Sequence, residues 1–116
     1  MAKITMRGHG TVSDVAEIII NGIDRSGIST ELVELVDRYY SDVRVTMLVF
    51  EKYYWRTSSR ASLSVLITGK GDAVTVDAVG AGGGNGVFLN FSWGAEDSFV
   101  DTVKHILGLH GFEEHY

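Results

Sequence analysis

The sequence contains neither cysteine nor proline. Without cysteine the chain can form no disulfide, offers no thiolate nucleophile and cannot bind zinc through sulfur. Without proline, every turn has to be made by glycine, asparagine, aspartate or serine. Turns are therefore expected where these four residue types cluster.

Positive charge and long apolar runs are also scarce. Ten lysines and arginines stand against 15 aspartates and glutamates, and the net charge of −5 argues against extended binding to a phosphate backbone. No apolar run approaches the ~20 residues of a membrane-spanning helix. The first residues carry Lys3 and Arg7 without the apolar stretch of a signal peptide. We expect a cytoplasmic protein that does not bind membranes, and the acidic charge disfavours nucleic acid as a partner.

The chain is expected to fold as one domain, residues 1–116, long enough to bury roughly two-thirds of its unfolded surface. Alternating apolar and polar residues predict a strand at 2–8. Thr11 begins a sequence typical of a helix capping box, and apolar residues at helical spacing predict a helix over 12–26. Residues 28–40 fit either a helix or a strand, and their apolar spacing slightly favours the helix. The residues that form this helical pattern are Ile28, Leu32, Leu35, Val36 and Tyr39.

From residue 43 onwards the pattern indicates β-structure. Strands are expected at 44–55, 60–68 and 73–79, with turns at 56–59 and 70–71. These turns pair Phe50 with Val65, and Val65 with Val76. Both predicted hairpins place the same apolar residues on one face, and a one-residue slip would scatter them over both faces. The predicted core face consists of Leu48, Phe50, Tyr54, Ala61, Leu63, Val65, Ile67, Val74, Val76 and Ala78.

The last third of the chain begins with a glycine-rich segment at 80–86. A fourth meander strand is expected at 87–92, a helix at 95–107 and a loose tail at 111–116. Strands grouped together, with helices at either end, predict an α+β fold. We expect two layers, with an antiparallel meander sheet of four to five strands packed against two to three helices.

The glycine-rich segment could bring backbone N–H groups close to an anion. Its spacing does not fit a G-x-G-x-x-G motif, because Asn85 stands where the third glycine belongs, and no Gly-Lys-Ser/Thr follows. A plain connection is the alternative. Lys52, on the predicted core face, is either a buried amine with a lowered pKa or a rim side chain that reaches water. A pocket between sheet and helices would be lined by Lys52, Tyr54, Gly82, Gly83 and Gly84.

The opposite face of the predicted sheet carries a corner of aromatic and basic residues. Trp55 and Arg60 are expected to be cross-strand neighbours that form a cation–π pair. Tyr53, Arg56 and Arg44 would complete a corner able to hold an anionic ligand or a stacked base. Beside it lie apolar residues that suggest cover by another element or a second subunit: Met47, Val49 and Leu66.

The histidines do not form a ligand pattern. His105, His110 and His115 are spaced by five residues, which does not align them on one helical face. No catalytic motif is recognisable either. The sequence therefore predicts no catalytic residue, no metal site and no cofactor.

Two stretches resemble a family of small uncharacterised bacterial proteins. One is Phe50-Glu-Lys-Tyr-Tyr-Trp-Arg-Thr-Ser-Ser-Arg-Ala-Ser-Leu63, and the other combines Gly82-Gly-Gly-Asn-Gly86 with Phe91-Ser-Trp-Gly-Ala-Glu96. The resemblance implies a bacterial cytoplasmic protein of unknown function. It supplies no catalytic residues to carry over.

Two functional hypotheses follow from these residues. The preferred one is a non-enzymatic binding or self-associating module that uses the outer sheet face, including a possible homo-oligomer. The alternative is a small-molecule-binding protein or enzyme with its pocket near Lys52, Tyr54 and residues 80–86. Binding of single-stranded nucleic acid is a third and weaker reading, because the chain is acidic.

Overall fold

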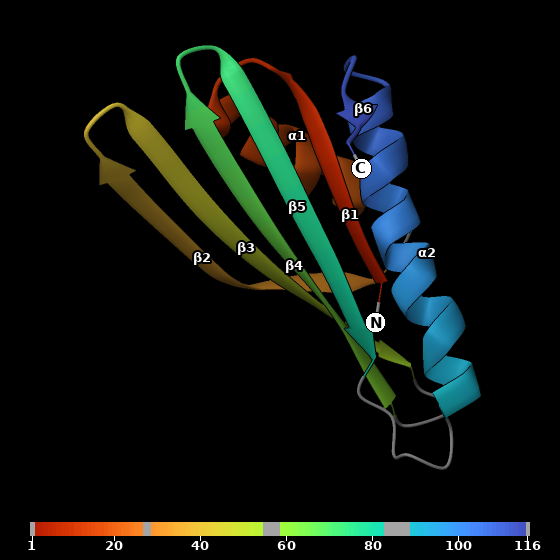
Figure 1. Cartoon of the computed structure of the whole chain (residues 1–116). Coiled ribbons are helices and arrows are strands. Elements are labelled where there is room, and N and C mark those ends of the chain that lie inside the picture. The colour runs from red at the N-terminus through yellow and green to blue at the C-terminus, as the bar shows by residue number, and fades with distance from the viewer. Residues whose placement is uncertain (1, 27–28, 55–58, 83–88, 116) are drawn as a thin grey trace.

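The computed structural model describes residues 2–26, 29–54, 59–82 and 89–115. They form an α+β fold with one antiparallel sheet and two helices (Figure 1). The elements in chain order are β1 (Ala2–His9), α1 (Val12–Arg25), β2 (Thr30–Tyr40), β3 (Val43–Tyr54), β4 (Ser59–Lys70), β5 (Ala73–Gly82), α2 (Leu89–Gly108) and β6 (Glu113–Glu114). The expected α+β class is confirmed, with six strands in place of the predicted four to five.

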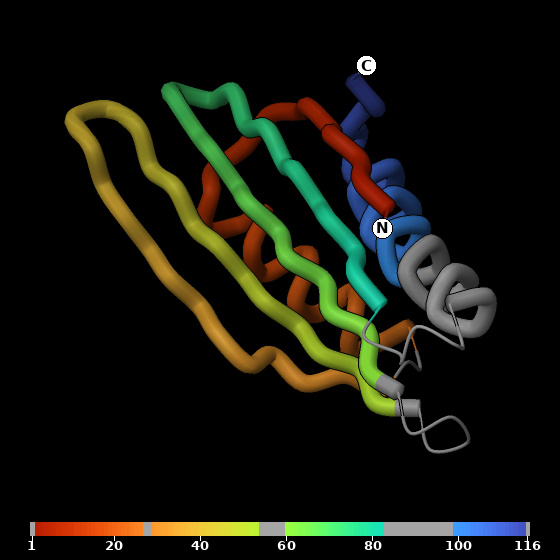
Figure 2. Tube along the Cα trace, turned by 60° about the horizontal axis from the view of Figure 1, so that its bottom comes forward, coloured from red at the N-terminus to blue at the C-terminus, as the bar shows by residue number. Residues whose placement is uncertain are grey.

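The sheet has the order β2-β3-β4-β5-β1-β6, so β2 and the short β6 form its two edges. Both helices lie on the same side of the sheet (Figures 1 and 2). Helix α1 packs against β2, β3 and β4, and α2 packs against β1, β4 and β5. Among the described elements, none covers the opposite face, which we call the outer face.

Helix α1 starts where the capping sequence predicts. The Thr11 hydroxyl accepts a hydrogen bond from the Asp14 backbone N–H at 3.1 Å, which satisfies one of the free donors of the first turn. The helix then buries one apolar stripe against the sheet, and the stripe consists of Val12, Val15, Ala16, Ile19 and Ile23. Burial of this stripe on the sheet, rather than helix propensity alone, is what makes a helix of this length stable.

The predicted core face is confirmed, although the predicted pairing is wrong by two residues. Phe50 lies opposite Leu63, not Val65, and Val65 lies opposite Ala78, not Val76. The reason is the turns: Tyr54 pairs with Ser59, and the second turn occupies Gly71–Asp72. A shift of two residues leaves every side chain on its face. All predicted core residues whose burial is described are buried: Leu48, Phe50, Ala61, Leu63, Val65, Ile67, Val74, Val76 and Ala78.

Three predictions outside the meander are wrong. Residues 30–40 form the strand β2, although a helix was slightly favoured over 28–40. Residues 89–92 belong to α2, so no meander strand extends over them. The predicted loose tail is anchored instead, because Phe112 is buried and Glu113–Glu114 pairs with β1.

Candidate interaction surface on edge strand β2

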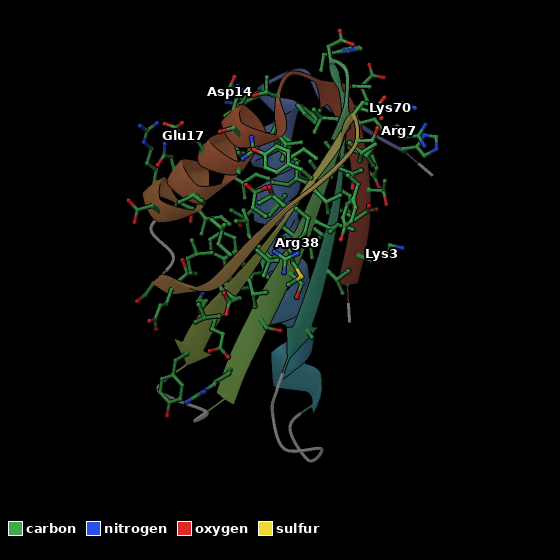
Figure 3. All side chains as sticks on the ribbon, turned by 90° about the vertical axis from the view of Figure 1, so that its left-hand side faces the viewer. Lys3, Arg7, Asp14, Glu17, Arg38 and Lys70 are labelled. Atoms are coloured by element: carbon green, nitrogen blue, oxygen red, sulfur yellow. The ribbon has the colours of Figure 1, made fainter. Side chains whose placement is uncertain are left out.

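Strand β2 lies at the edge of the sheet and, within the described residues, is paired on one side only, with β3. A β-bulge interrupts it at Val33, so that Leu32 lies opposite Phe50 while Glu34 lies opposite Val49. From Glu34 to the end of the strand the pairing is continuous. Figure 3 views the molecule from this edge, with Arg38 on the strand that faces the viewer.

Exposed apolar side chains are concentrated on β2. Among the described residues, eight large hydrophobic side chains are exposed, and five of them belong to this strand. The five are Leu32, Val33, Leu35, Tyr39 and Tyr40. The other three, Tyr53, Leu66 and Leu109, come from three different elements or their ends. An edge strand that has an unpaired side and carries exposed apolar side chains is a typical site for association with another chain.

The turn that follows β2 determines which backbone groups point to the open edge. Tyr40 pairs with Val43 across the two-residue loop Ser41–Asp42, and Ser41 has a φ of 57°, as a primed hairpin turn requires. Such a turn joins its flanking residues by a hydrogen bond, and the bonded pairs then alternate along the ladder. Leu35, Asp37 and Tyr39 consequently direct their backbone N–H and C=O groups away from β3.

Two of these outward groups are held by neighbouring charged side chains. The Leu35 N–H donates to a Glu34 carboxylate oxygen at 3.2 Å, and the Arg38 guanidinium donates to the Asp37 carbonyl at 2.9 Å. Both hydrogen bonds are exposed to solvent. The open edge therefore carries one acidic and one basic cap, each of which stabilises the fold only weakly.

A polar cluster on the helix-side face holds β2 against β3. Asp37 accepts two hydrogen bonds from Arg44, at 3.1 and 2.8 Å, and one from the Thr46 hydroxyl at 2.6 Å. These donors lower the pKa of Asp37 from 3.8 to about 2, Arg44 first and Thr46 second. Arg44 also lies over the Tyr39 ring, 4.9 Å from its centre. Arg44 was predicted to join the aromatic corner, and the structure places it in this cluster instead.

The predicted apolar residues of the outer face extend to β2. Met47 lies directly opposite Val36 on one side and Leu66 on the other. Val49 is opposite Glu34 and Ser64. We call Val36, Met47 and Leu66 the outer apolar row, since they line up across β2, β3 and β4. The row starts at the open edge of the sheet.

The structure describes only part of the predicted aromatic corner. Tyr53, rather than Trp55, lies opposite Arg60. Trp55 and Arg56 lie outside the described residues, so the predicted Trp55–Arg60 contact stays a prediction. A hollow of about 480 Å³ opens at this end of the sheet. It is lined by Ser29, Thr30, Glu31, Glu51, Lys52, Tyr53 and Arg60.

The predicted pocket residues are placed as follows. Lys52 continues the alternation of β3 on the core face and is half-buried. It lies opposite Ala61, which pairs with Gly82 on its other side. The Tyr54 side chain and residues 83–84 lie outside what the structure describes. In the described part of the chain, no group of three histidine, aspartate or glutamate side chains lies close enough to hold a metal ion.

Residues 1–110 match DUF6054, a family of unknown function. The chain belongs to this family. The match includes all of β2 and the outer apolar row and stops before Phe112. No curated protein and no solved structure matches the chain. Neither described helix has the length and apolar character needed to cross a membrane.

Family membership agrees with the sequence resemblance to proteins of unknown function, and it assigns no site. The candidate surface on β2 was missed at the sequence level because residues 28–40 fitted both a helix and a strand, and their apolar spacing slightly favoured the helix. Two signals could have revealed it. Val33, Leu35 and Tyr39 follow a strand period, and Glu34 and Arg38 place opposite charges two residues either side of Val36.

Proposed function

We propose that this protein is a non-enzymatic module that self-associates through β2 and the outer apolar row. The observation that carries the proposal is the concentration of exposed apolar side chains on an edge strand. Such an edge offers both unpaired backbone groups and apolar area, which are the two components of strand addition. The sequence resemblance adds a bacterial cytoplasmic setting to the proposal.

Two exposed leucines provide a matched test. Leu35 lies on β2 and is 48% exposed, whereas Leu109 follows α2 and is 73% exposed. We expect light scattering across a concentration series to show a dimer for the unmodified protein and for Leu109→Glu. Leu35→Glu should shift the protein to the monomer, because association would bury the new charge. Circular dichroism would confirm that both variants are folded.

The proposal fails if the unmodified protein is a strict monomer at the highest concentration reached. It also fails if Leu35→Glu and Leu109→Glu associate equally well, because association would then use another surface.

A second candidate function is binding of a small molecule in the hollow beside Lys52. Its volume of about 480 Å³ falls within the range of ligand sites, roughly 300–1,000 Å³. Glu31, Glu51, Lys52 and Arg60 surround it with charges of both signs, which suits a zwitterion such as a free amino acid. It ranks second because ligand sites are mostly lined by apolar side chains.

This alternative is tested by thermal unfolding in the presence of a panel of free amino acids. A ligand that binds the folded state raises the melting temperature. The rise should disappear in Lys52→Met and Arg60→Met and persist in Lys70→Met, which changes an exposed lysine at the far end of the sheet. The absence of any shift across the panel would exclude this class of ligand.

A further inference from the structure

The backbone pattern of β2 restricts how a second strand can pair with it. Leu35, Asp37 and Tyr39 point their backbone groups to the open edge, and within the described residues nothing else pairs there. In an antiparallel pair, outward residues must lie opposite outward residues. A second copy of the chain can therefore pair with β2 only in registers that differ by steps of two residues.

Charge distinguishes these registers. With Leu35 opposite its own copy, no opposite charges meet. One step further along the strand brings Val36 opposite Val36 of the second copy. Glu34 of each copy then lies opposite Arg38 of the other, so the symmetric pair contains two contacts between opposite charges. The next registers on either side place Asp37 opposite Asp37 of the second copy, or Glu34 opposite Glu34 of the second copy. Like charges directly opposite each other destabilise a strand pair, and opposite charges stabilise it.

We propose that two copies of the chain pair antiparallel along β2, with Val36 at the two-fold axis, to form one continuous sheet. This inference rests on the proposed self-association and adds its partner and register. A symmetric interface of this kind uses the same surface on both copies and closes at a dimer.

The two side-chain caps of the edge support this register. In it, the Leu35 N–H faces the Asp37 carbonyl of the second copy. These are the two backbone groups that Glu34 and Arg38 hold in the isolated chain. Pairing replaces both caps by a backbone hydrogen bond. It also releases the Glu34 carboxylate next to the released Arg38 guanidinium of the second copy, so each displaced group gains a new partner.

The outer apolar row gives independent support. Val36 is the member of the row at the open edge, beside Met47 and then Leu66. In the Val36-centred register the two rows join end to end across the two-fold axis, and the apolar strip becomes continuous over both copies. The cluster of Asp37 with Arg44 and Thr46 stays intact, so the Asp37 charge that faces Leu35 of the second copy is already compensated.

Charge reversal tests the register directly. Glu34→Arg alone puts arginine opposite Arg38, and Arg38→Glu alone puts glutamate opposite Glu34. Each variant should raise the dimer dissociation constant roughly tenfold or more. When the two variants are mixed, each copy meets a complementary partner, and a 1:1 heterodimer should form with near-normal affinity. The control is Lys3→Glu, which makes the same charge change as Arg38→Glu at an exposed position of β1 (Figure 3). It should leave dimerisation unchanged.

Single cysteines give a second measurement, because the chain has none of its own. Val36→Cys should form a disulfide-linked dimer under mild oxidation, since directly opposite residues lie within disulfide reach. Tyr40→Cys should not, because in this register the two Tyr40 positions lie about 27 Å apart, eight residues at ~3.4 Å each.

The outcomes separate the two proposals. A monomeric unmodified protein overturns the proposed function and the register together. A dimer that tolerates both charge reversals, or whose mixed variants fail to pair, overturns the register and leaves self-association standing. If Tyr40→Cys forms the disulfide-linked dimer in preference to Val36→Cys, the register is likewise overturned and self-association still stands.

Discussion

Phe112 anchors the C-terminal segment to β1, and the space for its ring exists because residue 8 is glycine. Phe112 is buried, and a Cβ atom added to Gly8 would lie 2.6–2.7 Å from three carbons of the ring. The backbone hydrogen bond from the His115 N–H to the Thr5 carbonyl, at 2.8 Å, continues the attachment. We therefore predict that Gly8 and Phe112 are strongly coupled in the stability of the fold.

The two single substitutions act through different costs. Phe112→Ala removes a buried ring and leaves a cavity, which costs about 3 kcal/mol, the lower end of the range for buried phenylalanines. For a chain of this size that lowers the melting temperature by about 10 °C. Gly8→Ala forces the ring to move and should cost about 1–3 kcal/mol as an overpacked contact.

The double variant reverses the sign of the second effect. Once the ring is gone, the added methyl group of Gly8→Ala meets no clash, and alanine is favoured over glycine in a strand by about 0.5–1 kcal/mol. Gly8→Ala should therefore destabilise the unmodified protein and slightly stabilise Phe112→Ala. Urea unfolding of the four proteins, followed by circular dichroism, should give a coupling free energy of about 2 kcal/mol. Equal effects of Gly8→Ala in both backgrounds would refute the proposed contact.

Three further predictions concern stability. Gly69→Ala would bring its Cβ atom into the Val12 side chain. It should lower the free energy of unfolding, measured by urea titration, by about 1–3 kcal/mol. In a Val12→Ala background most of this loss should disappear. Thr11→Ala removes the N-cap of α1 and should cost about 1 kcal/mol in the same assay, whereas Thr11→Ser should cost much less. The pKa of Asp37 is about 2 in the folded state against an ordinary 3.8, so its ionised form stabilises the fold above about pH 4, and that contribution is lost as the pH falls towards 2. The stability difference between the unmodified protein and Asp37→Asn should therefore be constant from pH 7 to 5 and shrink below pH 4; a difference independent of pH down to 3 would contradict the lowered pKa.

The faces of the central strands were predictable from the sequence, and their register was not. Alternation assigns each residue of β3, β4 and β5 to a face, and the buried residues agree with that assignment. Register depends on which residues form the turns, and serine and glycine clusters allow several choices. Lys70 pairs with Ala73 across Gly71–Asp72, one residue later than predicted. Each turn displaced by one residue shifts the pairing by two, which burial patterns cannot detect.

The start of α2 and the tail show a different limit. The alternation over Val87–Ser92 that predicted a strand also occurs by chance in helices, and residues 89–92 are helical. Phe112 is a single aromatic residue in a polar end segment, Gly111 to His115, so no periodicity indicates its burial. Its position depends on the gap beside Gly8, a contact between residues far apart in the sequence.

The misinterpretation of β2 has a physical cause that bears on its function. Four of the five residues that suggested a helical stripe lie on this strand, and the fifth, Ile28, lies outside the described residues. The bulge at Val33 puts Leu32 and Leu35, three residues apart, on the same face. Val36 then points to the outer face, so the strand carries apolar side chains on both faces. A helix buries such a pattern on one side, whereas a strand at the edge of a sheet cannot. In the isolated chain Leu32 and Leu35 are exposed and Val36 is half-buried. The proposed pairing with a second β2 would supply cover that the rest of the described fold does not. A strand with helical spacing of apolar residues, a bulge and opposite charges placed symmetrically about its centre is therefore a pattern that favours edge-to-edge association.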